Sequence, residues 1–325
     1  MSALSFSVVI CAYSDDRWLD LQRAVASVEV QTRPALETVV VVDHNPALLA
    51  RARAELASVR SVANGGERGL SGARNSGVDV ARGDVIAFLD DDATAADEWL
   101  EHLAACYADD EVIGAGGSIE PMWPRARPPW FPPEFDWVVG CTYRGMPSST
   151  ANVRNLIGAN MSLRRETLAA VAGFRSGIGR IGTRPVGCEE TELCIRALQR
   201  WPGRRLVYEP RACVSHRVDP ARAGWRYFLR RCYAEGQSKA QVARLRGARD
   251  ALATERAYTL RVLPLGLIGA LREAVRQRRP AQALAAAAIV AGLSATTVGY
   301  AAGQVRHARA RGAASPASPV PAGEA

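Results

Sequence analysis

The stretch Val85-Ile86-Ala87-Phe88-Leu89-Asp90-Asp91-Asp92 places three consecutive carboxylates directly after a short apolar run. Apolar residues without alternation are typical of a strand that is covered on both faces. If the extended backbone continues, Asp90 and Asp92 point to one side and Asp91 to the other. Paired carboxylates at such a position suit Mg²⁺ or Mn²⁺, and the alternative is a solvated acidic turn that caps the next helix. Because neighbouring carboxylates repel one another unless a cation is present, we favour the metal site.

Three further apolar runs precede this strand, and segments of helical character lie between the runs. The runs are Phe6 to Cys11, Thr38 to Val42 and Val59 to Val62, and the helical segments are Leu19 to Val30 and Pro46 to Leu56. This alternation predicts an α/β fold with a mostly parallel sheet and helices on both sides. In such folds ligands bind beyond the carboxyl ends of the strands.

Several candidate binding residues, most of them polar, follow these strands at the edge of the sheet where that rule places a ligand. Ala12 and Tyr13 come after the first run, Asp43 after the second and Asp90 after the fourth. Before the fourth run, residues 64–75 form a glycine-rich loop that leads into a helix. Such loops let backbone amides approach a phosphate, although this one matches neither the P-loop nor the dinucleotide-binding pattern. By itself the loop is a weak indication of nucleotide binding.

A proline-rich and aromatic segment lies between Pro121 and Pro147. It cannot form a regular helix, and its large aromatic residues, which include Trp123, Trp130 and Trp137, argue against disorder. The segment is either a binding loop or a packing element. We favour a binding loop, because aromatic faces suit sugar rings and because exposed loops carry function.

A second acidic group, Glu189 and Glu190, begins a predicted helix. At about 100° per residue, Glu190 falls within the apolar stripe made by Leu193, Cys194, Ala197 and Leu198. Glu192 falls on the other side, where it forms an i,i+4 pair with Arg196. An inward carboxylate in the first turn of a helix is either a cap that the helix dipole favours or a poised base, and the residues leave both open.

The last third of the chain is basic and helical in pattern. Residues 220–312 hold 17 Lys and Arg against 4 Asp and Glu, and the whole chain has a net charge of +8. Such a segment suits an anionic partner, either phospholipid head groups or nucleic acid, or it is a solvated arginine-rich face. Residues 280–305 are uncharged and exceed the roughly 20 residues that span a bilayer, yet they are mostly alanine and glycine. They span a membrane, lie at its interface or pack on their own domain, and the basic flanks favour membrane contact.

The sequence resembles family 2 glycosyltransferases of the GT-A fold. The motifs that carry the resemblance cover residues 5–220 in the family's order: Val8-Val9-Ile10-Cys11-Ala12-Tyr13, Val41-Val42-Asp43, Gly72-Ala73-Arg74-Asn75-Ser76-Gly77, Phe88-Leu89-Asp90-Asp91-Asp92, Gly158-Ala159-Asn160-Met161-Ser162, Gly173-Phe174 and Glu189-Glu190. The order of all these motifs is far more specific than any one of them. The resemblance implies a Rossmann-like α/β sheet of the GT-A type with a helical C-terminal extension.

The resemblance also implies the roles of individual residues. Ala12, Tyr13 and Asp43 are expected to hold the base and ribose of a nucleotide-diphospho-sugar, and Asp90 and Asp92 to serve a Mg²⁺ or Mn²⁺ ion and the diphosphate. The remaining predicted site residues are Arg74, Asn75 and Asn160 in the nucleotide-sugar site, His216 as a third metal ligand, Glu190 with Glu189 as the catalytic base, and Trp123, Trp130 and Trp137 in an acceptor site. The family usually has Glu-Asp where this chain has Glu189-Glu190, so the resemblance alone does not decide which of the two glutamates is the base.

The expected reaction is a single inverting transfer from a nucleotide-diphospho-sugar, with UDP as the nucleotide that the family suggests. The processive signature Gln-x-x-Arg-Trp is not matched, because Gln199-Arg200-Trp201 is too short. The acceptor is expected to be a glycan or a lipid-linked saccharide at a membrane surface. The chain is divided into a GT-A domain (1–220), a basic, membrane-associated helical extension (221–312) and a disordered tail (313–325).

Two other functions fit parts of the sequence. A sugar-nucleotidyltransferase also uses aspartates on Mg²⁺, but its early lysine-containing phosphate loop is missing and Lys239 is the chain's single lysine. A non-catalytic basic module that binds membrane or nucleic acid fits the charge, but no nucleic-acid motif accompanies it, so we expect no nucleic-acid partner. Residues 1–14 resemble neither a signal peptide nor a membrane span, and the seven scattered cysteines suggest reduced thiols. We therefore expect a cytoplasmic enzyme, peripheral on the cytoplasmic face of the membrane.

Overall fold

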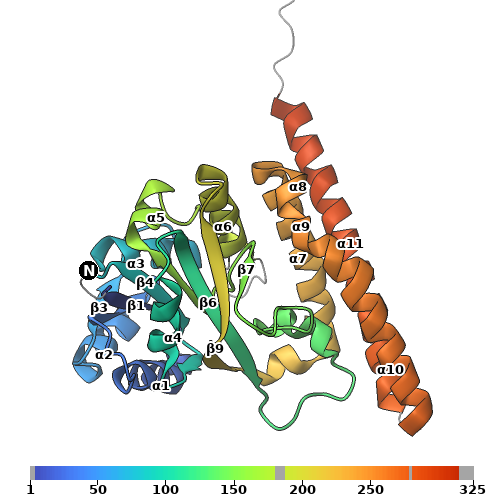
Figure 1. The fold of residues 1–325 in the computed structure, drawn as a ribbon, viewed down its shortest axis with the longest axis horizontal. Helices are drawn as coiled ribbons and strands as arrows, with labels where there is room; N and C mark the ends of the chain where they lie inside the picture. The colour runs from blue at the N-terminus through green and yellow to red at the C-terminus, as the bar shows by residue number, and fades with distance from the viewer. Residues whose placement is uncertain (1–3, 180–186, 278–279, 315–325) are drawn as a thin grey trace, which may run out of the picture.

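The computed structural model describes residues 4–179, 187–277 and 280–314. Its first half contains four parallel strands in the order β3-β2-β1-β4 (Figure 1). They are β1 (Phe6–Ala12), β2 (Glu37–Val42), β3 (Arg60–Ala63) and β4 (Val85–Asp90). The four predicted strands are therefore confirmed, and β1 and β4 end side by side with Cys11 opposite Asp90.

The second half of the sheet is mixed. Strand β8 (Asn160–Arg164) joins β4 in antiparallel fashion, and β6 (Val112–Met122) and β9 (Arg205–Arg217) follow it. Two short strands, β5 (Ala93–Ala95) and β7 (Ala151–Val153), pair antiparallel with β9. Because β5 comes directly after the three aspartates, its pairing with β9 draws the end of β9 to the end of β4. This strand pairing brings together residues that lie far apart in the sequence, and the candidate site forms where they meet.

Helices cover both faces of the sheet, as the alternating pattern predicts. One face buries α1 (Trp18–Glu29), α2 (Pro46–Glu55) and α4 (Trp99–Cys106) against alternate β1 residues such as Val8 and Ile10. The other face buries α3 (Leu70–Val80), α5 (Arg165–Ala170) and α6 (Glu189–Arg200) together with Val9. Short turns η1 (Asp15–Arg17), η2 (Pro133–Val139) and η3 (Pro220–Ala223) connect these elements.

The C-terminal third is helical and packs along one side of the sheet domain (Figure 1). It consists of α7 (Trp225–Arg246), α8 (Ala248–Ala251), α9 (Ala253–Ala257), the π-turn η4 (Tyr258–Val262), α10 (Leu263–Gln277) and α11 (Pro280–Ala314). Helices α7 and α11 lie in close contact, because a Cβ atom on Gly236 would stand 2.0 Å from the Thr296 carbonyl oxygen. A Cβ atom on Gly299 would likewise stand 2.1 Å from the Tyr233 carbonyl oxygen.

The proline-rich aromatic segment differs in part from the prediction of a binding loop. The Trp130 ring packs against the rings of Trp225 and Phe228, with centroids 4.9 and 5.6 Å away. The Trp123 ring packs against Phe131 at 5.1 Å. The segment thus supplies the apolar surface on which α7 docks, and this requirement explains its aromatic content.

The apolar stretch at 280–305 lies within α11. Residues Ala281–Arg306 are long and apolar enough to cross a bilayer, and 28% of the most apolar part is buried in the protein. One side of α11 packs on α7, whereas Leu284, Val290 and Val298 on other parts of its surface are more than half exposed. Of the predicted tail, residues 315–325 lie outside the described part of the chain, and the division into domains at residue 220 stays a prediction.

Candidate active site

A small pocket lies at the carboxyl ends of β1, β2 and β4. It is lined by Ala12, Tyr13, Asp43 and Asp90, all four predicted from the sequence, and by Cys11, Arg17, Leu70, Ala73 and Asp91. Asp43 is held in place by the side-chain amide of Asn64, which donates to Oδ1 at 2.6 Å, and by the Gly69 backbone N–H, which donates to Oδ2 at 3.0 Å. The glycine-rich loop therefore shapes this pocket by fixing Asp43.

Next to this pocket, two carboxylates and an imidazole converge. Asp90, Asp92 and His216 each offer one ligand atom, and these atoms all lie within 4.8 Å of one another. The cause is the strand pairing, since Ala93 of β5 stands opposite His216 of β9. His216 Nε2 lies 3.0 Å from Asp92 Oδ1, although 124 residues separate the two along the chain. The structure therefore brings together the three residues that the sequence analysis proposed as metal ligands.

Arg17 was missed by the sequence analysis. Its guanidinium lies 2.8 Å from Asp91 Oδ1 and 3.0 Å from Asp92 Oδ2. It stands in η1 just beyond β1, so the strand-end rule could have found it. Arg222 lies farther away, 4.0 Å from Asp92. The negative charge of Asp91 and Asp92 is thus compensated by Arg17 and Arg222, which come from distant parts of the chain.

The two buried aspartates differ in their electrostatics. Burial and the charge of Asp92 raise the pKa of Asp91 to about 7. Burial also opposes ionisation of Asp92, but the charges of His216 and Arg17 outweigh it and hold the pKa of Asp92 below its usual range. Asp92 is therefore ionised at neutral pH, as a metal ligand must be. Burial lowers the pKa of His216, but the charge of Asp92 outweighs it and raises this pKa to about 10, so a bound cation would take the place of the proton on the imidazole.

The residues present fit a divalent cation. Carboxylate oxygens and an imidazole nitrogen are ordinary ligands of transition-metal ions, and both come from strand ends, which hold them rigidly. Cys141 Sγ lies 3.8 Å from His216 Nδ1, the ring nitrogen away from Asp92, so the imidazole is oriented from its far side. A bound ion would be held by Asp90, Asp92 and His216.

Glu189 and Glu190 occupy the first turn of α6 and have different surroundings. Glu189 is buried, and its Oε1 accepts a hydrogen bond from Arg74 at 3.0 Å. Arg74 also lies 3.5 Å from Asp90, so one guanidinium joins Glu189 to the metal cluster. Glu190 is half-buried and lines a separate cavity. Burial and the charge of Glu189 raise the pKa of Glu190 to about 8, whereas Glu189 is locked in an ion pair.

Two of the predicted nucleotide-sugar residues make several hydrogen bonds within the protein. Asn160 is fully buried, accepts from the Trp99 indole at 2.8 Å and donates to the carbonyl groups of Ser118 and Ala212. Asn75 exchanges two hydrogen bonds of 2.8 Å with the backbone of Phe174. Both amides tie strands and turns together, and their role in nucleotide-sugar binding stays a prediction.

The position of Glu192 differs from the simple helical projection. The predicted pair with Arg196 forms at 2.7 Å, but Glu192 is fully buried rather than at the surface. Arg246, at the end of α7, covers it and contacts its carboxylate at 2.6 Å. A contact between distant helices thus outweighs the outward direction that the pattern of α6 alone suggests.

A larger cavity of about 340 Å³ lies between the sheet domain and the C-terminal helices. Glu190 and Thr191 stand in its wall, and so does Trp137, one of the three predicted acceptor residues. The other two, Trp123 and Trp130, pack in the aromatic cluster described above. The candidate site therefore has two compartments, a small pocket at the strand ends and a cavity beyond Glu190, and Arg74 joins Asp90 of the pocket to Glu189 at the start of α6.

Comparisons with known proteins agree with this geometry. The model of Glycosyl transferase family 2 matches residues 7–171. A glucosyl-dolichyl phosphate glucuronosyltransferase of Haloferax volcanii is 35% identical over 240 residues, which are 73% of this chain and 76% of that protein. The succinoglycan biosynthesis protein ExoM of Rhizobium meliloti is 24% identical over 246 residues, which are 74% of this chain and 75% of that protein.

Solved structures show the same fold. A mannosyltransferase from Pyrobaculum calidifontis, in complex with GDP-Man and Mn²⁺, superposes with a TM-score of 0.58 at 17% identity and covers 94% of this chain and 88% of that chain. Together with the family match and the Asp-Asp-His cluster, these comparisons settle the class of the protein. The chain belongs to glycosyl transferase family 2, and it is a glycosyltransferase of the GT-A fold.

Proposed function

We propose that this enzyme transfers a sugar, with inversion, from a nucleotide-diphospho-sugar to a hydroxyl group of a lipid-linked saccharide, and that UDP-sugars are its donors. The observation that carries the proposal is the position of Glu190. It lines the larger cavity and stands next to Glu189, which the Arg74 guanidinium joins to Asp90. In this proposal Glu190 is the proton acceptor on the cavity side, and its neighbour Glu189 is joined through Arg74 to the donor pocket.

The donor side uses the strand-end pocket. Ala12, Tyr13 and Asp43 would hold the nucleoside, and Asp90, Asp92 and His216 would hold a divalent cation. We expect Mn²⁺ rather than Mg²⁺, because the set contains an imidazole and Mg²⁺ favours oxygen ligands. When bound, the cation neutralises charge on the diphosphate leaving group. Arg17, close to the same carboxylates, adds positive charge at this place.

The acceptor side uses Glu190 as the base. A carboxylate accepts a proton more readily when its pKa is raised, and burial raises the pKa of Glu190 to about 8. It would remove the proton of the acceptor hydroxyl as the oxygen attacks the anomeric carbon from the face opposite the diphosphate. Attack from that face inverts the anomeric configuration. Glu189 would position the helix end through Arg74 and would not exchange protons.

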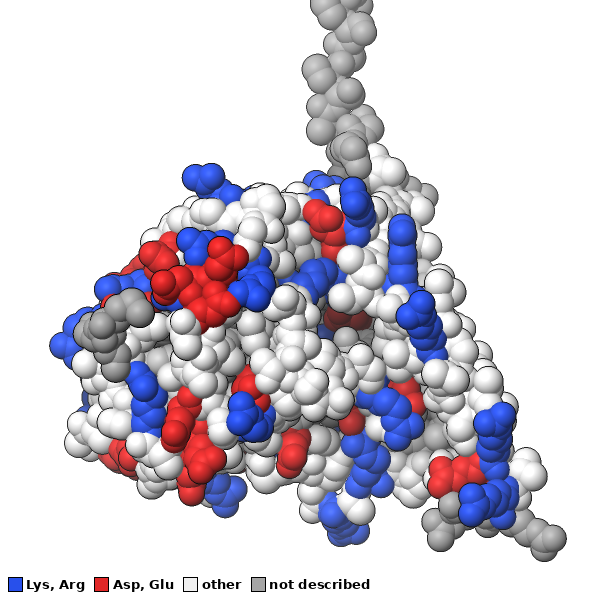
Figure 2. All heavy atoms as spheres, in the orientation of Figure 1, with Lys and Arg blue, Asp and Glu red and all other residues white. Residues whose placement is uncertain are grey.

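A lipid-linked acceptor is supported by the relative from Haloferax volcanii, because the name of that enzyme includes a lipid-linked sugar, glucosyl-dolichyl phosphate. It is also supported by α10, which exposes Leu265, Ile268, Leu271 and Val275. Arg261 precedes these residues in the sequence, Arg272 lies among them and Arg276 follows them. Figure 2 shows basic side chains along the C-terminal helices. An exposed apolar row with basic neighbours is the pattern of a helix that lies in the surface of an anionic membrane.

We further propose that α11 lies along the membrane surface and does not cross it. Its close glycine contacts with α7 hold it beside the sheet domain. A crossing helix would have to leave that contact. The enzyme would then be peripheral, on the cytoplasmic face, where nucleotide sugars are made.

The test is direct. The purified protein is incubated with Mn²⁺ and a panel of UDP- and GDP-sugars, and release of the nucleoside diphosphate is measured with and without lipid-linked saccharides. Proton NMR of the product then gives the anomeric configuration. A stimulated release with an inverted product is expected. A retained configuration would overturn the mechanism, and pyrophosphate exchange without sugar transfer would overturn the function.

A further inference from the structure

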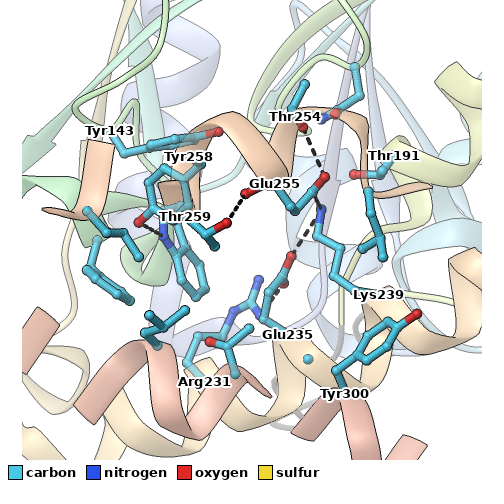
Figure 3. A pocket seen from close by; sticks show the side chains of 18 of the residues that line it. Tyr143, Thr191, Arg231, Glu235, Lys239, Thr254, Glu255, Tyr258, Thr259 and Tyr300 are labelled. Atoms are coloured by element: carbon cyan, nitrogen blue, oxygen red, sulfur yellow. Dashed lines mark hydrogen bonds and ion pairs between the residues drawn. The ribbon is translucent and has the colours of Figure 1, made fainter. Parts of the chain in front are cut away.

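We propose that the cavity between the sheet domain and the C-terminal helices is the acceptor site, and that it selects an uncharged sugar unit whose lipid leaves toward α10. This inference rests on the proposed function and deepens it, because it names the chemical class of the acceptor's terminal residue. Figure 3 shows the cavity with its side chains.

The size and lining of the cavity fit a sugar. Its volume of about 340 Å³ lies at the lower end of the roughly 300–1,000 Å³ typical of small-molecule sites. Aromatic rings form much of the wall: Trp137, Tyr143, Tyr258, Tyr300 and Phe135. Such rings pack on the apolar faces of pyranoses. Hydroxyl groups of Thr191, Thr254 and Thr259 lie among them as hydrogen-bonding partners.

The charged groups of the cavity form a closed network. Arg231 contacts Glu235 at 2.7 Å, and Lys239 contacts Glu255 at 2.6 Å and Glu235 at 3.6 Å (Figure 3). Arg154 contacts Glu255 at 2.6 Å. Burial opposes ionisation of both glutamates, but the cations outweigh it and lower the pKa values of Glu235 and Glu255 to about 2. Both glutamates are therefore ionised at neutral pH and fully paired with the cations.

The net charge of the cavity determines whether it favours an anionic or an uncharged sugar. Among the described residues that line the cavity, three cations stand against Glu235, Glu255 and the base Glu190. Above pH 8, where Glu190 is ionised and ready to accept a proton, the three carboxylates balance the three cations and the cavity is neutral. An anionic sugar would then bring a carboxylate into a half-buried space where every cation already has a partner, and burying an uncompensated charge is costly. An uncharged sugar can instead donate hydroxyl hydrogen bonds to the fixed carboxylates.

The cavity also gives the acceptor a direction. Glu190 and Thr191 of α6 stand in the wall that belongs to the sheet domain, next to the donor side. Leu263 and Leu293, from the first turn of α10 and from α11, belong to the wall made by the C-terminal helices. Leu263 itself is buried, and α10 carries its exposed apolar row, Leu265, Ile268, Leu271 and Val275, beyond it. A sugar hydroxyl at Glu190 therefore leaves the lipid on the side that we assign to the membrane.

The experiment compares two probes that differ by one charge. Binding of octyl β-D-glucopyranoside and of octyl β-D-glucuronide to the full-length protein is measured by calorimetry at pH 9, where Glu190 is ionised, and below their micelle concentrations. The glucoside is expected to bind at least tenfold more tightly. The variant Glu255→Gln makes the cavity positive and should reduce this preference at least fivefold, whereas the exposed control Glu166→Gln should leave it unchanged. Equal binding of the two probes, or tighter binding of the glucuronide, would overturn the proposal.

A second variant locates the probe. Leu293→Trp fills the cavity and should weaken glucoside binding at least tenfold, and the matched control Leu36→Trp, at an exposed position before β2, should not. Circular dichroism and the melting temperature show whether each variant is folded. Unchanged glucoside binding in folded Leu293→Trp, or no glucoside binding by the wild-type protein, would refute this site.

The two proposals fail separately. Release of a nucleoside diphosphate from a donor tests glycosyl transfer without any acceptor. If the donor is hydrolysed but the glucoside does not bind, the acceptor site is wrong and the proposed function stands. If the glucoside binds but no donor is hydrolysed, the cavity binds sugars and the proposed function is wrong.

Discussion

Arg74 Nη1 lies 3.0 Å from Glu189 Oε1, and both side chains are buried in the protein. The same guanidinium donates to the Gly158 carbonyl oxygen and lies 3.5 Å from Asp90. It is therefore the structural link between β4, which carries Asp90 of the candidate metal site, and α6, which carries the proposed base Glu190. A residue in such a position should affect stability and catalysis together.

Removing one partner of this pair should destabilise the fold. Arg74→Met leaves the Glu189 carboxylate buried without its cation, and loss of one partner of a buried pair costs about 3–5 kcal/mol. The double variant Arg74→Met/Glu189→Gln should recover part of this free energy, because no charge is left uncompensated. Urea denaturation of the wild type, Arg74→Met, Glu189→Gln and the double variant measures the coupling free energy between the two side chains. A cost below about 1 kcal/mol for Arg74→Met would show that the pair is not as buried as described.

The metal cluster predicts a defined loss of Mn²⁺ affinity. Asp92→Asn and His216→Gln should each weaken Mn²⁺ binding by a factor of roughly 100 in the presence of a nucleoside diphosphate, because each removes a direct ligand. EDTA should remove donor binding and turnover, and added Mn²⁺ should restore both. Electron paramagnetic resonance of free Mn²⁺ gives the affinity without an activity assay. Asp97→Asn, an exposed neighbour, is the matched control, and an equal loss in this variant would contradict the assignment.

The raised pKa of Glu190 predicts the pH dependence. The base must be ionised to accept a proton, and burial raises its pKa to about 8. kcat/KM should therefore rise about tenfold per pH unit below pH 7 and level off above about pH 9. The measurement is a pH profile of sugar transfer at saturating Mn²⁺. A flat profile from pH 6 upward would mean that Glu190 is not the group that titrates.

Membrane contact through α10 can be tested by flotation with vesicles. Substituting Ile268 and Leu271 together by glutamate places charges in the exposed apolar row, and binding to vesicles with anionic phosphatidylglycerol should fall at least tenfold. High salt should weaken wild-type binding too, because the arginines act through electrostatics. Leu36→Glu, an exposed leucine elsewhere, should bind as the wild type does. Equal binding of all three proteins would remove α10 from the membrane contact.

The strands and helices of the first half could be predicted because each is set by local pattern. The apolar runs at 6–11 and 85–89 lack alternation and become β1 and β4, and the polar residues after them, such as Asp43 and Asp90, meet in one pocket. The strand-end rule depends only on parallel strand direction. It therefore predicted that these residues meet in one pocket without any knowledge of tertiary contacts.

The remaining features depend on contacts between distant segments. Asn160 follows the motif pattern of a binding residue, yet its bonds to Trp99, Ser118 and Ala212 place it in the core. Trp130 lies in a segment that resembles a binding loop, yet α7 needs it as a docking surface. The cavity beyond Glu190 exists only because the C-terminal helices fold back on the sheet domain. No periodicity within one segment contains that information.

The central claim is that Glu190, and not Glu189, is the base that accepts the acceptor's proton. The decisive measurement is single-turnover sugar transfer by Glu190→Gln and by Glu189→Gln, with donor affinity determined in parallel. For Glu190→Gln we predict a loss of about 10²–10⁴ in rate with donor affinity unchanged, and the pH dependence near pH 8 should vanish. Transfer at the wild-type rate by Glu190→Gln would contradict the account.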